Sequence, residues 1–425
     1  MKFICFECAR EYPVAHPVIY RCECGGLLDT VHDWRHTDAE QLRRLFDMRR
    51  ADRHTPLSGG VWRYKELIHP SLPIEHIVTK YEGNTGLYEH ELLRRYTGVR
   101  RLWLKAQSEN PSGSFKDNGM TVAVSHGLWL GWERFACTST GNTSSSMAMY
   151  AALAGKEAVV FLPAAGVSLN KSLQTEAYGA RLLRTEGGYD EGIRFLEQYA
   201  GQLGLYVCNS INPLRIEGQK SIVFELAHDL RWKLPDWIVL PGGALSNASA
   251  LGKGLEELHR IGLIESLPRV AVIQAQGASP FHAMLRSERR QLHPVLSPDT
   301  VASALNIGNP PNWPKALRYA IERTGGVTAS VSDEDILAAK SVIDRSGIGC
   351  EPASAAAVAG LRKLVADGTI GPDETAACIL TGHLLKDTEA IVKSLSAGIP
   401  AGRYPAAAAT AIRLDAEHVA RALQA

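Results

Sequence analysis

Short apolar runs alternate with segments of helical length through most of the chain. The runs are four to six residues long and end at polar or glycine-containing turns. The predicted strands are residues 101–106, 135–138, 157–162, 181–185, 237–240, 270–275 and 375–380. Such alternation is typical of parallel α/β sheets, in which ligands bind beyond the carboxyl ends of the strands. The pattern therefore predicts an α/β protein whose functional site lies in those turns.

Residues 1–35 differ from the rest, because four of the eight cysteines fall within the first 24 positions. Cys5-x-x-Cys8 has the spacing of a metal knuckle, whereas Cys22-x-Cys24 is one residue tighter than the usual pair. Zinc held by the four thiolates is the favoured hypothesis, because zinc prefers tetrahedral sites of soft ligands. A closed site of four sulfurs would be structural, because it has no open position for a reactant. A small cysteine-containing cap that has lost its metal is the alternative.

The composition favours chemistry on small molecules. Lys+Arg number 46 and Asp+Glu 45, so no basic excess favours nucleic acid or anionic lipid as a partner. The N-terminus lacks the apolar core of a signal peptide, and the apolar stretches are too short to cross a membrane. The other four cysteines lie in apolar segments and make a poor disulfide framework, which predicts a cytoplasmic protein. These cysteines, expected to be buried, are Cys137, Cys208, Cys350 and Cys378.

Lys116 is the strongest candidate for a catalytic residue. It follows the turn Ser112-Gly-Ser and opens an amphipathic helix from about residue 115. Partial burial near the positive end of a helix disfavours the ammonium form, and the neutral amine can form an imine with an aldehyde cofactor. A solvated lysine in the first turn is the alternative; the neighbouring turns favour catalysis.

Three further polar segments are suited to anions. Residues 139–143 precede a helix of small residues, where hydroxyls and main-chain N–H groups suit a carboxylate. Residues 242–247 follow an apolar run, and adjacent glycines let N–H groups approach a phosphate. The loop 209–220 contains Arg215, whose planar guanidinium can clamp phosphate. The alternatives are a helix cap, a structural turn and a solvated loop arginine respectively.

Together these segments resemble the threonine synthases, a family of fold-type II pyridoxal-phosphate (PLP) enzymes, over almost the whole chain. The matching segments are Glu82-Gly-Asn-Thr, Ser112-Gly-Ser-Phe-Lys-Asp, Ser139-Thr-Gly-Asn-Thr, 171–180, 209–220, Ile307-Gly-Asn-Pro, Glu351-Pro-Ala-Ser-Ala and Thr381-Gly-His. The resemblance implies a tryptophan synthase β-like fold with two parallel-sheet lobes and an N-terminal zinc-ribbon-like segment. The expected division is a ribbon at 1–35, a large PLP-binding domain at 36–127 and 222–425, and a small domain at 128–221.

The resemblance also implies a role for each candidate residue. Lys116 would hold PLP as a Schiff base and shuttle protons, with Phe115 beside the cofactor. Asn142 would bond the ring hydroxyl of PLP, and Thr381 its pyridine nitrogen, which a hydroxyl partner leaves largely unprotonated. The cofactor phosphate would lie on Gly242, Gly243, Ala244, Leu245, Ser246 and Asn247. The substrate carboxylate would lie on Ser139, Thr140 and Thr143, and the substrate phosphate on Asn209, Ser210 and Arg215.

The implied activity is the conversion of O-phospho-L-homoserine and water to L-threonine and phosphate, by a carbon–oxygen lyase that is a homodimer. Three departures from the family pattern leave the substrate open. Gly243-Ala-Leu-Ser-Asn replaces the usual Gly-Asn-x-Gly-Asn, Gly86 stands where proline is usual, and Asn306 where arginine is common. A paralogue performing β- or γ-replacement on another phosphorylated amino acid is one alternative. A catalytically silent binding protein is another, although binding alone requires no imine-forming lysine.

Overall fold

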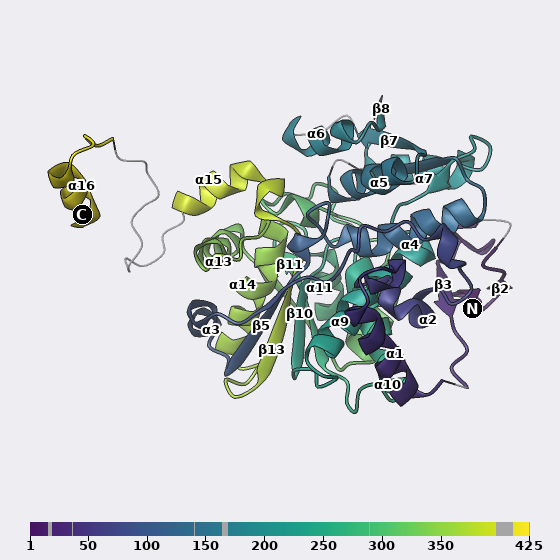
Figure 1. Cartoon of the computed structure of the whole chain (residues 1–425), viewed down its shortest axis with the longest axis horizontal. Helices are drawn as coiled ribbons and strands as arrows, with labels where there is room; N and C mark the ends of the chain where they lie inside the picture. The colour runs from purple at the N-terminus through teal and green to yellow at the C-terminus, as the bar shows by residue number, and fades with distance from the viewer. Residues whose placement is uncertain are drawn as a thin grey trace.

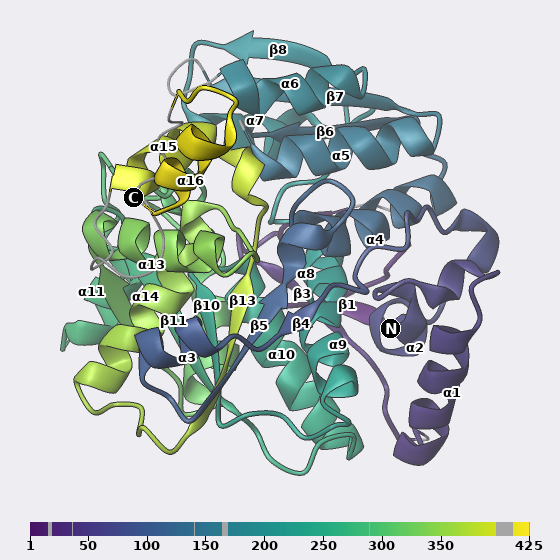
Figure 2. The same cartoon turned by 60° about the vertical axis from the view of Figure 1, so that its left-hand side comes forward.

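Three β-sheets organise the chain in the computed structural model (Figure 1). The structure describes residues 1–15, 19–35, 37–139, 141–163, 169–288, 290–396 and 411–424. A three-stranded antiparallel sheet with the order β2-β1-β3 lies at the N-terminus. A six-stranded sheet has the order β12-β11-β10-β13-β5-β4, and a four-stranded sheet the order β8-β7-β6-β9. The two larger sheets lie in separate layers of helices and strands (Figure 2).

The six-stranded sheet is parallel except for its edge strand β4. Its central strand β10 is buried along its whole length, which explains the uninterrupted apolar run Trp-Ile-Val-Leu in the sequence. The strands are β4 (Leu87–Tyr88), β5 (Arg101–Ala106), β10 (Trp237–Pro241), β11 (Arg269–Ala275), β12 (Val327–Val331) and β13 (Thr375–Leu380). The helices of this part of the chain are α3 (Glu91–Thr97), α4 (Lys116–Trp129), α8 (Pro213–Gln219), α9 (Ser221–Asp229), α10 (Ser246–Ile261), α11 (Pro280–Arg286), α12 (Trp313–Ala316), α13 (Asp333–Arg345), α14 (Pro352–Ala366) and α15 (Thr388–Ser396).

The four-stranded sheet is entirely parallel and is built from the middle of the chain. Its strands are β6 (Arg134–Thr138), β7 (Glu157–Pro163), β8 (Arg181–Thr185) and β9 (Tyr206–Val207), and its helices α5 (Asn142–Leu153), α6 (Leu169–Ala177) and α7 (Tyr189–Tyr199). All seven strands predicted from the sequence are present. The strands β4 and β9 were not predicted, because each has only two residues and so shows no pattern. The half-exposed β12 was not predicted because it contains polar residues.

The N-terminal segment packs beside the large sheet and its helices (Figure 1). Its strands are β1 (Lys2–Cys5), β2 (Glu11–Tyr12) and β3 (Leu28–Val31), followed by the helices α1 (Ala39–Ala51) and α2 (Lys65–Ile68). Helix α1 is amphipathic, because it buries Leu42 and Phe46 and exposes most of its charged residues. A last helix, α16 (Ala416–Gln424), follows near the C-terminus.

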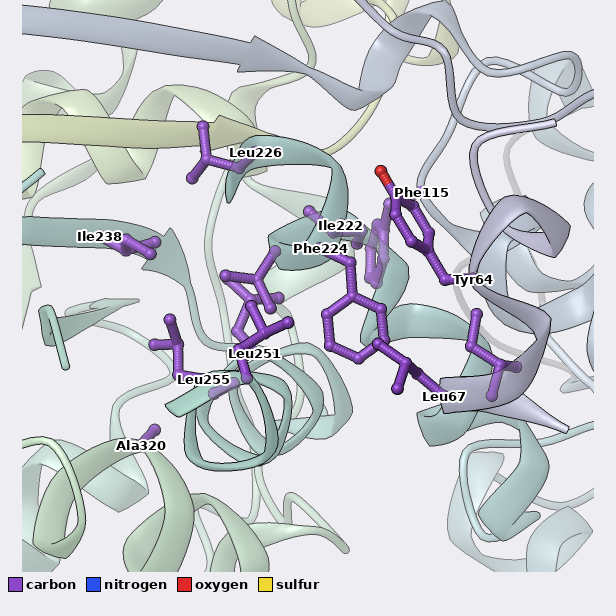
Figure 3. Packing of buried hydrophobic residues seen from close by; sticks show 14 of the residues in the cluster. Tyr64, Leu67, Phe115, Ile222, Phe224, Leu226, Ile238, Leu251, Leu255 and Ala320 are labelled. Atoms are coloured by element: carbon purple, nitrogen blue, oxygen red, sulfur yellow. The ribbon is translucent and has the colours of Figure 1, made fainter. Parts of the chain in front are cut away.

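A continuous apolar core extends from the N-terminal segment to the large sheet. It contains Phe3 and Leu28 of the N-terminal sheet together with residues of α9, α10 and β10. Figure 3 shows Phe115, the residue before Lys116, among the side chains of this cluster. Phe115 thus anchors the start of α4 in this core.

Candidate active site

The turns singled out in the sequence come together at the carboxyl ends of neighbouring strands. In the large sheet, β10, β13 and β5 are adjacent and parallel, so the loops after Pro241, Leu380 and Ala106 leave the same edge. In the small sheet, β6 and β9 are adjacent and parallel, so the loops after Thr138 and Val207 also leave together. This is the position at which parallel α/β sheets bind ligands.

The turn before Lys116 is held by two sets of hydrogen bonds. Asp117 accepts from the main-chain N–H of Ser112 at 2.7 Å, from the Ser112 hydroxyl at 2.6 Å and from the Ser146 hydroxyl at 2.5 Å. The main chain then joins the end of β13, because the N–H of Phe115 donates to the carbonyl of Thr381 at 2.9 Å. Lys116 and Thr381 are therefore fixed relative to each other by backbone.

Lys116 is partly buried at the N-terminus of α4, with its Nζ 4.0 Å from the centroid of the Phe115 ring. Burial and the positive charge of Arg215 together lower the pKa of Lys116 to about 7, while Glu351 opposes the shift. At this pKa the amine is neutral in a large fraction of molecules near neutral pH. The side chain is thus a nucleophile suited to an aldehyde.

Asn142 and Thr381 lie on either side of one buried carboxylate, that of Glu351. The amide of Asn142 donates to Glu351 Oε2 at 3.0 Å, and the hydroxyl of Thr381 donates to Glu351 Oε1 at 3.1 Å. Thr381 also lies 3.0 Å from the hydroxyl of Ser354. The family resemblance predicted that Asn142 and Thr381 contact the cofactor ring. It assigned no role to Glu351, which occupies the N-cap position of α14.

The N-terminus of α5 forms a second part of the site. Ser139 follows β6 directly, and its hydroxyl accepts from the N–H of Gly141 at 3.2 Å. Thr143 is partly buried in the first turn of the helix. Thr140 lies outside the described residues. The free N–H groups of a helix N-terminus suit a carboxylate, and the role expected for Ser139 and Thr143 stays a prediction.

The loop 242–247 is compact and tightly surrounded. A Cβ on Gly243 would lie 2.7 Å from the carbonyl oxygen of Ala304, so only glycine fits there. Leu245 adopts a left-handed backbone conformation (φ 63°), and α10 begins at the next residue. The loop keeps Gly243 and Asn247 of the family pattern; Leu245 stands at its variable position, and Ser246, the first residue of α10, at its second glycine.

Arg215 and Ser210 are buried on the side of the site formed by β9 and α8. The Arg215 guanidinium donates to the carbonyl of Cys208 at 2.5 Å. The amide of Asn209 bonds both main-chain groups of Thr138, at 3.0 and 2.9 Å, and so holds β6 and β9 together. Of the three residues expected to hold the substrate phosphate, Asn209 therefore already has structural partners.

Several buried polar atoms around these loops have no hydrogen-bond partner within the described parts of the chain. They are Ser114 Oγ, Ser210 Oγ, Arg215 Nε, Asn247 Oδ1, Asn247 Nδ2 and Asn312 Oδ1. Buried polar groups are almost always hydrogen-bonded in folded proteins, so this group of unsatisfied donors and acceptors indicates a polar ligand. An amine-reactive aldehyde that also carries a phosphate, such as PLP, fits the set formed by Lys116, Asn247 and the loop 242–247.

The comparisons with known proteins agree with this geometry. Residues 78–382 match the family model described as pyridoxal-phosphate dependent enzyme. The threonine synthase of Methanosarcina acetivorans is 45% identical over 391 residues, 91% of this chain and 93% of that one. The threonine synthase of Methanocaldococcus jannaschii is 41% identical over 92% of this chain and 94% of that one. The chain belongs to the threonine synthase family. It is a PLP-dependent enzyme, as the sequence predicted.

The solved structures establish the fold class. The threonine synthase of Escherichia coli matches with a TM-score of 0.72 at 18% identity, covering 95% of this chain and 93% of that one. Maize serine racemase matches with a TM-score of 0.65 at 16% identity, covering 79% of this chain. The predicted fold-type II architecture is thus confirmed, and the exact domain boundaries stay a prediction. Within the described residues, no helix combines the length and apolar character needed to cross a bilayer.

The pKa of Lys116 leads to a testable pH dependence for this threonine synthase family member. With a pKa of about 7, about a tenth of the lysine is neutral at pH 6 and about nine-tenths at pH 8. We expect PLP capture by the cofactor-free protein to accelerate about tenfold over this interval and then to level off. Stopped-flow absorption measures the rate, with N-acetyl-lysine amide as the control whose rate keeps rising above pH 8. A protein rate that rises in parallel with the control would contradict the lowered pKa.

The four N-terminal cysteines form a compact group that fits zinc. The sulfurs of Cys5 and Cys24, of Cys8 and Cys22, and of Cys8 and Cys24 are each 3.5 Å apart. A tetrahedral zinc site with Zn–S bonds of 2.3 Å requires about 3.8 Å between sulfurs. The N–H of Cys8 also donates to the sulfur of Cys5 at 3.4 Å, which fits a knuckle around a thiolate. The tighter Cys22-x-Cys24 spacing therefore does not prevent all four sulfurs from converging.

Replacing Cys22 by serine is expected to remove the metal. The wild-type chain should contain about one zinc per molecule by mass spectrometry, and Cys22→Ser only a small fraction of that. Loss of a structural zinc should also lower Tm by about 5 °C or more. Cys137→Ser is the matched control, because Cys137 is buried in β6 and should leave the zinc content unchanged. Equal zinc content in both variants would show that the cysteine cluster holds no metal.

A second cluster of residues that could bind a metal instead binds the ammonium group of a lysine. His32, Glu217 and Glu257 lie within metal-binding distance of one another and are buried. The Nζ of Lys220 lies 2.6 Å from Glu217 and 2.5 Å from Glu257. A cation is thus already supplied by the chain, and this group is a buried ionic network rather than a metal site.

Sequence analysis missed three polar residues near the site. Glu351 bridges Asn142 and Thr381. Asn312 donates to the carbonyls of Ser210 and Ala244, at 3.3 and 3.4 Å, and so joins two of the anion loops. Lys386 donates to Ser145 at 3.1 Å and to Gln174, so it joins the two lobes. The segment Glu351-Pro-Ala-Ser-Ala was a signal for the first, whereas no local pattern marked the other two.

Proposed function

We propose that the chain converts O-phospho-L-homoserine and water to L-threonine and phosphate. The observation that carries this proposal is a buried arginine beside a lysine of lowered pKa. The Arg215 Nε and the Ser210 hydroxyl have no partner among the described residues, and the Arg215 charge acts on Lys116. A substrate with a phosphate close to its reacting carbons satisfies both features. The threonine synthases at 41–45% identity support the same substrate.

Different segments of the chain bind the different charged groups of the substrate and the cofactor. The N-terminus of α5, with Ser139 and Thr143, holds the substrate carboxylate. Ser210 and Arg215 hold its phosphate, and Asn209 positions their loop by bonding the main chain of Thr138. The loop from Gly242 to Asn247 holds the cofactor phosphate. Bound PLP supplies an aldehyde and an electron-withdrawing ring that stabilises negative charge on the substrate carbons.

Lys116 acts as the base and acid of the reaction. Its amine removes the protons from Cα and Cβ of the substrate, because a pKa near neutrality lets it take up and return a proton. Asn142 and Thr381 hold the two polar edges of the cofactor ring, and Glu351 orients both. Arg215 stabilises the phosphate as it leaves from Cγ.

The test mixes PLP-loaded protein with O-phospho-L-homoserine and measures threonine and inorganic phosphate together. Equal release of both supports the proposal. Phosphate without threonine, or bound PLP without turnover, would direct attention to another phosphorylated amino acid. The first positions to exchange would then be Ala244 and Ser246, where the loop departs from the family pattern.

Three further expectations belong with this proposal. We propose that the protein is a homodimer and acts in the cytoplasm. We also propose the domain division 1–35, 36–127 with 222–425, and 128–221. Light scattering of the purified chain tests the first, and limited proteolysis tests the boundaries. The near-neutral charge and the family membership support small-molecule substrates rather than nucleic acid.

A further inference from the structure

Glu217 lies two residues beyond Arg215 on α8, and its carboxylate is completely buried among basic side chains. Glu217 Oε2 lies 2.6 Å from Nε2 of His32 and 2.6 Å from Nζ of Lys220, and Oε1 lies 2.5 Å from Nζ of Lys253. Residues two apart on an α-helix point about 200° away from each other. Arg215, whose charge acts on Lys116, therefore leaves one face of α8, and Glu217 anchors the opposite face of the same helix.

The N-terminal segment supplies the other end of this network. Lys253 donates to Asp29 Oδ1 at 2.9 Å and to the carbonyl of Thr30 at 2.6 Å, in addition to its bond with Glu217. Tyr319 donates to Asp29 Oδ2 at 2.7 Å. Strand β3 is thereby joined to α8 and to α10, the helix that begins at the proposed cofactor-phosphate loop.

The charges of the network are balanced within the described residues. Three carboxyl groups, of Asp29, Glu217 and Glu257, face three amines, of Lys220, Lys253 and Lys315. Burial lowers the pKa of His32 to about 4, with the charge on Lys220 contributing, so its imidazole is neutral and donates to Glu217. Removing an ionised member disturbs this balance of buried charges, and removing His32 leaves Glu217 without one of its three donors, so the geometry of α8 depends on the network.

A separate contact holds the opposite end of the same loop. The main-chain N–H of Val207 donates to the hydroxyl of Tyr20 at 2.8 Å, two residues before Asn209. The segment from Val207 to Glu217, which contains Ser210 and Arg215, is thus held at both ends by residues 20–32. In contrast, Lys116 and Thr381 are joined by their own main-chain bond and do not depend on these contacts.

We infer that Tyr20, Asp29 and His32 are positioning residues for the substrate-phosphate side of the active site. They act through Glu217, Lys253 and the Val207 backbone, and they set the direction of Arg215. This inference rests on the proposed function, because it assigns the anion at Arg215 to the substrate. The N-terminal segment therefore positions the loop that binds the substrate phosphate, whereas Lys116 and Thr381 are held together by their own main-chain bond.

The test compares His32→Leu with His32→Gln in the PLP-loaded protein. Glutamine places an amide N–H near the position of the imidazole Nε2 and keeps the donor to Glu217, whereas leucine removes it. We expect His32→Leu to raise KM for O-phospho-L-homoserine by about tenfold or more, with kcat within about twofold of wild type. His32→Gln should restore most of the affinity. Titration with L-threonine, which has no phosphate, should give the same Kd in all three proteins.

The outcomes separate this inference from the proposed function. An unchanged KM in folded His32→Leu would overturn the positioning role. The role would also be overturned if the affinities for L-threonine and for PLP fell as much as the affinity for O-phospho-L-homoserine. If His32→Leu does not fold, Tyr20→Phe removes only the acceptor for Val207 and should raise KM by about threefold in the same direction. Titration of inorganic phosphate into the PLP-loaded proteins needs no turnover. Weaker phosphate binding in the variant supports positioning even where wild type fails to form threonine, and unchanged phosphate binding would contradict it.

Discussion

Replacing Lys116 by alanine is expected to reduce threonine formation by about 10⁴-fold or more. The variant loses both the amine that captures the cofactor and the group that moves protons at Cα and Cβ, and each function contributes several orders of magnitude. Lys116 is the lysine at the carboxyl edge of the large sheet with a pKa near 7, set by burial and by Arg215. The measurement is the joint release of threonine and phosphate under saturating substrate and PLP.

Lys116→Arg is the matched variant. It keeps a positive charge and similar bulk, but its guanidinium stays protonated and cannot react with an aldehyde. We expect the same loss of turnover as for Lys116→Ala, because the reaction requires a reactive amine and not only a positive charge at this position. Borohydride reduction of the wild-type holoenzyme should fix PLP on the peptide containing Lys116, and neither variant should give that product. Turnover above about 1% of wild type in either variant would assign the role to another residue.

Local patterns in the sequence were sufficient to predict the strands and the turns that form the site. The central strands are buried on both faces and appear as uninterrupted apolar runs, as in residues 237–240. Parallel strands then place the turns after Leu380, Pro241 and Ala106 at one edge. The sequence therefore predicted that Lys116, Thr381 and the loop 242–247 lie at the carboxyl ends of strands, whereas the strand order that makes them neighbours comes from the fold.

Contacts between distant segments could not be predicted in this way. Glu351 lies 30 positions before Thr381 in the chain, and its role becomes visible only when both face Asn142. The amide of Asn209, expected to bind phosphate, is used by the backbone of Thr138 because β6 and β9 pair. The link from His32 to Glu217 spans 185 positions, and nothing in either local sequence indicates the partner. Side-chain pairing across the fold depends on packing that local periodicity does not contain.

Removing the guanidinium of Arg215 is expected to lower kcat/KM for O-phospho-L-homoserine by about 10³-fold in Arg215→Met. The side chain is buried, its Nε has no partner among the described residues, and a charge-assisted bond to phosphate in such a place is strong. Arg215→Lys keeps the charge without the planar fork, so its loss should be smaller, about 10²-fold. Steady-state kinetics with both variants and wild type measure the difference.

The same substitution has a second consequence at Lys116, and its sign follows from the charge. The positive charge of Arg215 lowers the pKa of Lys116, so Arg215→Met should raise that pKa and move the onset of PLP capture to higher pH. Arg215→Lys, which retains the charge, should leave the onset near its wild-type position. A structural defect alone would weaken substrate binding. It would not shift the pH profile of PLP capture in Arg215→Met while leaving it unshifted in Arg215→Lys. An unchanged pH profile of PLP capture in Arg215→Met, together with unchanged kcat/KM, would show that Arg215 lies outside the site. The proposal that Arg215 binds a substrate phosphate would then be wrong.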